Sequence, residues 1–363
     1  MILQGIGSNS CFDSVVDRDC GLETRYLSRA KRTFGVCRYD DERQAQDMVE
    51  RAIQLKSTLS VVLVGIDFSD SSRLAYDRAC EIAALHDASL VIVHVLPSAP
   101  MSVHGIQPVM SPPDLSGRIR ELARQKLVSL EEAAAARGVS AETILTVGTP
   151  GAALCELANE RNADGLIVGT RGLTGVKHLV LGSTAEYVVR NASCPVLTIH
   201  PNDGGSLVRP QTAIVPIELR GDSQQAGLHI HQWLGERAQS LNVLLLYCDH
   251  VPVILQPWLR DLGIERIGFE EIRGRVEEAV APAVASLSEL GFQVETLVQE
   301  GEPGSVICEL ARARNVDLIA METHARTGTA HWLLGSTTER VVQHAGCAVL
   351  TLHDIDRVES VLD

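Results

Sequence analysis

The residues best suited to ligand chemistry in this chain of 363 residues lie between positions 169 and 184. Gly169 and Gly172 follow an apolar run, and Gly182 precedes Ser183 and Thr184 at the start of an expected helix. Glycine lets the main chain turn tightly and lets a ligand approach without a Cβ in the way. The first N–H groups of a helix lack partners and favour an anion. Together, these features suit a phosphate group.

The spacing of these glycines excludes two common phosphate motifs but leaves a structural alternative open. The chain has no G-x-x-x-x-G-K-[ST] sequence, and this turn lacks the G-x-G-x-x-G of a dinucleotide fold. A glycine turn can also serve only as a corner. The sequences that begin at Ser183 and Ser336 are both S-x-x-E, the pattern of a capping box, which starts a helix with or without a ligand.

The composition of the chain argues against several classes of binding partner. The formal net charge of −14 argues against a nucleic acid or an anionic membrane as the partner. No apolar run approaches the roughly 18 residues of a membrane-spanning helix. The start of the chain lacks the pattern of a secretion signal, and the nine cysteines include no C-x-x-C pair, which fits reduced thiols and argues against zinc. We therefore expect a cytoplasmic protein.

The chain repeats itself. Residues 144–200 align without a gap onto 297–353 at a constant offset of 153, because 335 − 182 and 308 − 155 both equal 153. A period of this length indicates two copies of a domain and not a solenoid. We expect a first domain at 58–202 and a second at 210–355. Residues 1–57 have no counterpart, and they predict a poorly packed extension with one exposed helix, or natural translation from Met48.

Each copy alternates short apolar runs with amphipathic stretches. Five such runs, rich in β-branched residues and separated by helical patterns, predict a parallel sheet with helices on both faces. The expected fold is therefore α/β and doubly wound, with two domains in tandem. The last expected strand of the first copy is followed by His200, which can simply be exposed.

The glycine pattern resembles a known family. Gly169-x2-Gly172-x9-Gly182-Ser183 matches the complete G-2x-G-9x-G-[ST] nucleotide motif of the universal stress protein family. Val-Gly-Ile-Asp67-Phe-Ser resembles the first strand and turn of that family, and Leu-Val-Ile-Val-His-Val95 resembles its second strand. The likeness covers residues 58 to 353.

The resemblance implies a ligand and its contacts. Family members with the full motif bind ATP, with Mg²⁺ bridging phosphate oxygens. The resemblance places the phosphates at the glycine turn and at the start of the following helix. It places the adenine beside the end of the first strand, where the second strand provides main-chain contacts. The residues concerned are Asp67, Val95, Gly169, Arg171, Gly172, Gly182, Ser183 and Thr184. Family sheets have the strand order 3-2-1-4-5 and pair through their fifth strands, which predicts an internal pseudo-dimer; a homodimer is a further expectation.

The second copy departs from the motif. Gly169 and Gly172 are replaced by Glu322 and Ala325, although Gly335-Ser336 is kept. Asp67 and Gly65 are likewise replaced by Glu218 and Pro216. A carboxylate in the turn would repel a polyphosphate, so we predict one ATP site, in the first domain, and a second domain that is degenerate or binds something else.

The sequence favours a nucleotide-dependent stress-response module over an enzyme. It offers no activated nucleophile with an oriented base, so any ATP hydrolysis would be slow. Two alternatives stay open. One is a nucleotide-using ligase or pyrophosphatase on a related fold, whose phosphate loop would follow the first strand, where this chain reads Ser69-Asp-Ser-Ser. The other is a ligand-free dimeric scaffold.

Overall fold

A computed structural model describes residues 58–97, 115–172, 181–201, 209–218, 225–251, 268–323 and 335–352, with positions 203, 207 and 255. The expected N-terminal extension, its helix, Met48 and Ala325 lie outside these residues. Among the helices described, none is both long and apolar enough to cross a bilayer.

The first domain alternates strands and helices along the chain. Its elements are β1 (Val61–Gly65), α3 (Asp70–His86), β2 (Ser89–Pro97), α4 (Leu115–Ala135), β3 (Ala141–Gly148), α5 (Pro150–Glu160), β4 (Gly165–Gly169), α6 (Ser183–Asn191) and β5 (Val196–Ile199). The expected element types are confirmed.

The second domain repeats this order. Its elements are β6 (Thr212–Ile217), α7 (Gln225–Leu234), the short 3₁₀ helix η1 (Gly235–Ala238), β7 (Asn242–Asp249), α9 (Phe269–Glu289), β8 (Gln293–Glu300), α10 (Pro303–Ala313), β9 (Leu318–Glu322), α11 (Ser336–His344) and β10 (Ala348–Leu352). One expected helix, 223–239, is in fact α7 followed by η1, because a left-handed glycine at 235 (φ 54°) ends the α-helix.

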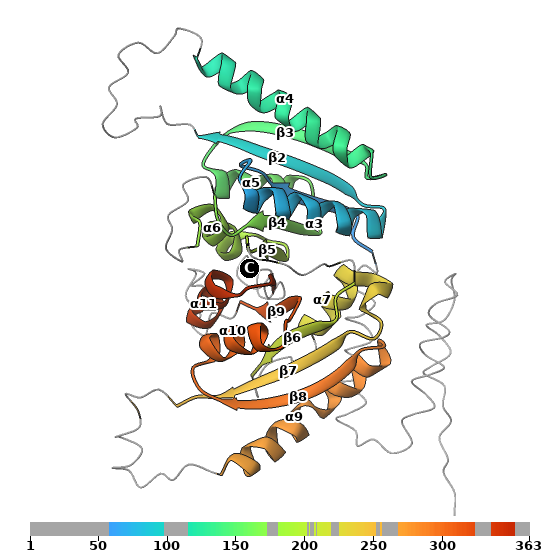
Figure 1. Cartoon of the computed structure of the whole chain (residues 1–363), viewed down its shortest axis with the longest axis vertical. Helices are drawn as coiled ribbons and strands as arrows, with labels where there is room; N and C mark the ends of the chain where they lie inside the picture. The colour runs from blue at the N-terminus through green and yellow to red at the C-terminus, as the bar shows by residue number, and fades with distance from the viewer. Residues whose placement is uncertain are drawn as a thin grey trace, which may run out of the picture. The chain divides into compact units, whose positions relative to one another are not determined.

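The ten strands that the structure describes belong to one sheet, in the order β3-β2-β1-β4-β5-β10-β9-β6-β7-β8 (Figure 1). Within each domain the paired strands are parallel, and each half has the predicted order 3-2-1-4-5. Strand β6 pairs with β9 as β1 pairs with β4, and the aligned pairs are Val62↔Gly165 and Ala213↔Leu318. The repeat in the sequence is therefore a repeat of the fold.

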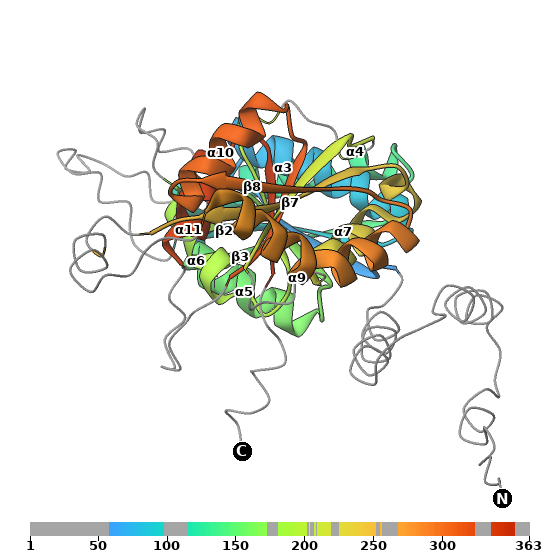
Figure 2. The same ribbon diagram turned by 90° about the horizontal axis from the view of Figure 1, so that it is seen from below.

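Helices cover both faces of the sheet, and each face has its own hydrophobic core (Figures 1 and 2). One core gathers apolar side chains of α3, α4, α7 and α9, and the other those of α5, α6, α10 and α11. Successive strand residues alternate between the cores, as Val62 and Val64 on one side and Leu63 on the other illustrate. This two-sided burial explains why the strands read as continuous apolar runs.

The repeated motif Arg-Asn-x-Asp fixes the start of the first strand of each domain by hydrogen bonds. Asn162 and Asn315 adopt left-handed backbones (φ 48° and 49°) just after α5 and α10, where asparagine is tolerated better than most residues. Asp164 Oδ2 then accepts hydrogen bonds from the Ser60 and Val61 amides at 2.6 and 3.0 Å. Asp317 Oδ2 does the same for residues 211 and 212, at 2.7 and 3.1 Å. The same pair of aspartate-to-amide hydrogen bonds therefore anchors the first strand of each domain.

The two domains meet through their fifth strands, as predicted. Strands β5 and β10 pair antiparallel, with Leu350 opposite Leu197. Thr198 Oγ1 donates to the Val349 carbonyl at 3.2 Å, and its counterpart Thr351 donates to the Val196 carbonyl at 3.1 Å. The pairing is thus pseudo-symmetric, and it joins the two five-stranded halves into one sheet, so that neither fifth strand is left as an exposed edge.

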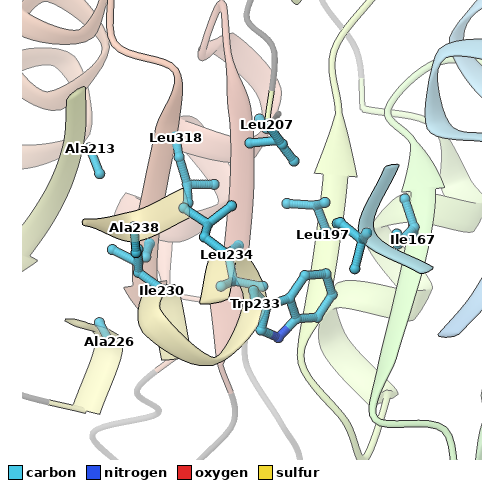
Figure 3. Close-up of a cluster of buried hydrophobic side chains, with 14 of the residues drawn as sticks. Ile167, Leu197, Leu207, Ala213, Ala226, Ile230, Trp233, Leu234, Ala238 and Leu318 are labelled. Carbon is cyan, nitrogen blue, oxygen red and sulfur yellow. The ribbon is translucent and has the colours of Figure 1, made fainter. Parts of the chain in front are cut away.

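A tryptophan of the second domain fills a space in the first. Trp233 of α7 is only 2% exposed and points toward Leu197 and Ile167 (Figure 3). A Cβ at Gly165 would lie 2.4 Å from the indole ring, so the glycine makes room for it. The Trp233 carbonyl also lies 3.0 Å from His86 Nε2. The domain pairing therefore extends beyond the strands into the core.

Candidate functional site

The site lies where the strand order of the first domain reverses. Strand β1 pairs with β2 on one side and with β4 on the other, which makes this the topological switch point of the sheet. Ligands of doubly wound sheets bind outside the carboxyl ends of the strands at such a point. Asp67 lies two residues beyond β1, Gly169 ends β4, and Val95 (8% exposed) is near the end of β2. The fold therefore brings these residues to one edge.

The glycine turn is held to the last strand and to the following helix. Thr170 donates to the Ile199 carbonyl from its amide at 2.9 Å and from its hydroxyl at 3.3 Å. The Gly182 amide donates to the Thr170 carbonyl at 2.9 Å, which fixes the start of α6 against the turn. Gly169, Thr170, Gly172 and Gly182 therefore form one connected unit, although residues 173–180 lie outside the description.

The glycines make room for neighbouring side chains. A Cβ at Gly172 would lie 2.8 Å from Asp67 Oδ2, and one at Gly169 would lie 2.5 Å from Ser71 Oγ. Neither glycine has a left-handed backbone. The turn conformation itself is therefore open to other residues, and the sequence argument from glycine's conformational freedom was wrong on this point. What the turn requires is the absence of a side chain.

Asp67 is fixed by the residues that follow it. Its Oδ1 accepts hydrogen bonds from the Ser69 amide at 3.0 Å and from the Ser69 hydroxyl at 2.5 Å. Ser69 is also the N-cap of α3, where its oxygen accepts a hydrogen bond from the Ser72 amide at 3.2 Å. The Ser69 hydroxyl lies 3.4 Å from the Arg171 carbonyl as well. The adenine end and the phosphate end of the expected site therefore share one hydrogen-bonded network.

Helix α6 begins at a glycine. Its N-cap, Gly182, has no side chain that could accept a hydrogen bond from the first turn, and within the part of the chain that the structure describes no side-chain cap is present. The predicted capping box is wrong, because Ser183 is already inside the helix and exposed, and Glu186 accepts from Arg190 at 3.0 Å instead. Thr184, half-buried, lies in the same turn. The first N–H groups of α6 thus resemble those that bind anions in other proteins.

The turn of the second domain makes the same hydrogen bonds to the last strand but carries a different side chain. Thr323 donates to the Leu352 carbonyl from its amide (2.8 Å) and hydroxyl (3.1 Å), as Thr170 does to Ile199. Helix α11 also begins at an uncapped glycine, Gly335, so its expected capping box is wrong too. The half-buried Glu322, however, occupies the position of Gly169. A ligand that suits one turn therefore meets a carboxylate in the other.

One charged and one titratable group flank the turn of the first domain. His200, directly after β5, is 5% exposed, so the expectation of an exposed residue was wrong. Burial lowers the pKa of His200, and the positive charge of Arg171 lowers it further. Arg171 therefore lies close enough to act on His200 through space. The sequence did not predict a place in this site for His200, Ser69 or Ser71, although the Ser-Asp-Ser-Ser run after β1 did carry the signal of a helix cap.

The fold and the site define a class: a tandem, doubly wound α/β protein with a glycine turn and an uncapped helix at the switch point of its first domain. The model of the universal stress protein family matches residues 58–200 and again 211–353. The two matches cover most of the chain, and the protein therefore belongs to this family.

Individual relatives and solved structures are similar to part or most of the chain. The universal stress protein YxiE of Bacillus subtilis is 32% identical over 143 residues, which are 38% of this chain and 97% of YxiE. A universal stress protein structure from Archaeoglobus fulgidus has the same fold over 81% of this chain and 98% of its own, with a TM-score of 0.56 and 18% identity. Another structure, of a universal stress protein in complex with cAMP, is 33% identical and covers 40% of this chain and 98% of its own, with a TM-score of 0.31.

Proposed function

We propose that the first domain binds ATP, with Mg²⁺ bridging the phosphates, and that the protein acts in the cytoplasm as a nucleotide-dependent module of the stress response. The observation that carries the proposal is the uncapped first turn of α6 beside the glycine turn and Arg171. Helix N–H groups and a guanidinium provide hydrogen bonds and charge suited to phosphate oxygens. Asp67 and Val95 are the proposed contacts for adenine.

Helix α3 offers a poorer position for phosphate. Its N-terminus is already capped by Ser69, and the Asp67 carboxylate lies beside that cap. A ligase or pyrophosphatase would need its phosphate loop there. An added polyphosphate would have to displace the cap and approach a carboxylate, so the arrangement favours a phosphate at α6. We therefore propose binding and not turnover as the main activity of the site.

The second domain is proposed not to bind ATP. Two unit negative charges about 5 Å apart repel by about 3 kcal/mol at an effective dielectric constant of about 20. Glu322 and the exposed Glu218 replace Gly169 and Asp67 and both bear carboxylates. An opposing term of this size would weaken binding by more than a hundredfold.

A scaffold is the second candidate, because the main-chain pairing of β5 with β10 joins the two domains. Gly172→Asp separates the two functions. The new carboxylate would lie beside Asp67 and the phosphate position, so we expect saturable binding of Mg-ATP by the wild type and none by the variant, in equilibrium titrations of the full chain. Absence of saturable binding by the wild type would contradict the proposed function and leave the scaffold.

A further inference from the structure

The pairing of β1 with β2 stops one residue earlier than its counterpart in the second domain. In the first domain, the last paired residues are Gly65 and Val93. In the second domain, the pairing of β6 with β7 continues one step beyond the equivalent position, to Ile217 and Tyr247. Counted from these pairs, the residues of the second domain that correspond to Ile66, His94 and Val95 are Ile217, Tyr247 and Cys248.

The main chain of the first domain is placed for the same further step. The Ile66 amide donates to the Val93 carbonyl at 2.8 Å, as a continuing parallel ladder requires. The next hydrogen bond of such a ladder would run from the Val95 amide to the Ile66 carbonyl. The second domain takes this step, because Ile217, the counterpart of Ile66, is paired. A local feature of the first domain therefore interrupts its ladder.

That feature is the side chain of His94, which takes the place of the missing donor. Its Nδ1 lies 2.6 Å from the Ile66 carbonyl, and this nitrogen carries the hydrogen because a carbonyl can only accept. Tyr247, the counterpart of His94, has no ring N–H. Among the described residues, the Val95 amide is thus left at the end of β1 without a ladder partner. A main-chain N–H in a residue as little exposed as Val95 needs another acceptor.

Phe68 holds the imidazole ring of His94 in place. The centroids of the two rings are 4.6 Å apart, and Lys126 Nζ of α4 lies 4.8 Å from the Phe68 centroid. Phe68 also has a left-handed backbone (φ 65°), which does not continue a strand and is strained for a bulky residue. Such strain persists where the surrounding contacts impose it, and it is common at ligand sites. The early end of the ladder is therefore held by side-chain contacts on both sides of Asp67.

We propose that His94 is a positioning residue, which ends the β1–β2 ladder early and so keeps the Val95 amide available as a hydrogen-bond donor to an acceptor nitrogen of the base. The proposal rests on the proposed function for the identity of the ligand, whereas the interrupted ladder is independent of it. In the second domain, the ladder uses the corresponding amide, that of Cys248. His94 thus gives a reason for a single nucleotide site per chain that does not depend on Glu322.

Site-resolved amide hydrogen exchange of the full chain, without nucleotide, tests the interrupted ladder. His94→Phe keeps the aromatic ring and removes the donor, whereas His94→Asn keeps a donor and removes the ring. In His94→Phe, the Ile66 carbonyl should accept the Val95 amide, so that exchange at Val95 slows about tenfold, the factor that one hydrogen bond implies. In His94→Asn, exchange at Val95 should stay as fast as in the wild type. A residue that only stabilises the fold would speed exchange when it is replaced, so unchanged or faster exchange at Val95 in His94→Phe refutes the proposal.

The reverse substitution in the second domain decides the question if His94→Phe does not fold. Tyr247→His provides a ring N–H beside the Ile217 carbonyl, so we expect it to release the Cys248 amide from the ladder. Exchange at Cys248 should then be about tenfold faster than in the wild type. Unchanged exchange at Cys248 would mean that a histidine at this position does not end the ladder.

Titration of the same proteins with Mg-ATP tests the contact with the ligand. His94→Phe should bind ATP about tenfold more weakly than the wild type, and His94→Asn about as tightly. The control is His86→Phe, which removes another ring nitrogen that contacts a main-chain carbonyl, that of Trp233 at 3.0 Å. It should change neither the exchange at Val95 nor the affinity for ATP.

Two outcomes separate the failure of this inference from that of the proposed function. Slower exchange at Val95 with wild-type affinity for ATP in His94→Phe would show that the amide does not meet the ligand, and would overturn the inference alone. If none of the proteins binds ATP, the proposed function fails, and the exchange comparison still decides whether His94 interrupts the ladder.

Discussion

Gly172→Ala is the substitution whose effect the structure specifies most closely. The glycine has no left-handed backbone, so alanine adds a methyl group and no backbone strain. That methyl group would lie 2.8 Å from Asp67 Oδ2, whereas an ordinary contact begins at 3.4 Å. The carboxylate must therefore move by about 0.6 Å, the difference between the two distances. Among the described residues, no other side chain lies within 4 Å of the added methyl group.

The displacement has a cost that can be worked out. Asp67 Oδ1 is 3.0 Å from the Ser69 amide, and a shift of about 0.6 Å along that line gives 3.6 Å, which is no longer a hydrogen bond. Hydrogen bonds to charged groups contribute about 1.5–3 kcal/mol. If Asp67 contacts the bound nucleotide, Gly172→Ala should weaken ATP binding by about 10- to 100-fold. The fold should survive, because overpacking of this kind costs about 1–3 kcal/mol.

Isothermal titration of the full chain measures this effect. Gly148→Ala, in the same domain, is the matched control, because its Cβ would meet nothing closer than Ala153 at 3.9 Å. In an Asp67→Ala background, Gly172→Ala should add almost nothing, since the carboxylate that it displaces is gone. Wild-type affinity in Gly172→Ala would refute the reasoning. An undiminished effect in the Asp67→Ala background would show that the glycine acts by another route.

Three further predictions concern stability. Trp233→Ala should lower the free energy of unfolding by about 3–5 kcal/mol, against less than about 1 kcal/mol for the exposed Phe269→Ala; equal losses in urea unfolding would contradict the packing at Gly165. Burial lowers the pKa of His229 from 6.5 to about 4, so the unfolded chain binds the proton first and stability falls as the pH drops below about 6.5. Between pH 7 and 4.5, the free energy of unfolding in urea should fall by about 2–3 kcal/mol more in the wild type than in His229→Gln. Equal decreases in the two proteins would contradict the lowered pKa of His229. For Glu302, burial would raise the carboxyl pKa, but hydrogen bonds from Ser305 and Gly304 outweigh it and lower the pKa. The roughly 1 kcal/mol that this N-cap contributes at pH 7 over Glu302→Ala should shrink as the pH falls below 4.5 and through the folded pKa, and a difference that does not shrink on acidification in urea unfolding would be inconsistent with it.

Much of the fold could be predicted from the sequence because its signals are local or repeated. Two-sided apolar runs such as Leu166–Val168 predicted buried parallel strands, and the offset of 153 predicted equivalent roles that Asp164 and Asp317 then displayed. The resemblance gave the strand order and the pairing through β5 and β10, which are confirmed.

The predictions that the structure contradicts depend on contacts between residues far apart in the chain. Ser-x-x-Glu after Gly182 satisfied the local pattern of a capping box, but the Gly182–Thr170 hydrogen bond places the helix start one residue earlier than the pattern implies. The sequence allowed His200 to be exposed, because no local signal distinguishes an exposed strand end from a buried one, and the fold buries it. The need for a glycine at position 172 comes from the side chain of Asp67, which only the fold brings next to it.

The two domains share a fold but differ at the turn, so the number of nucleotides bound per chain distinguishes one site from two. Equilibrium dialysis of the full chain against Mg-ATP should saturate at one ATP per chain, and Gly172→Asp should abolish that binding. Two ATP molecules per chain, or one that persists in Gly172→Asp, would contradict the account, because the nucleotide would then occupy the domain in which Glu322 replaces Gly169.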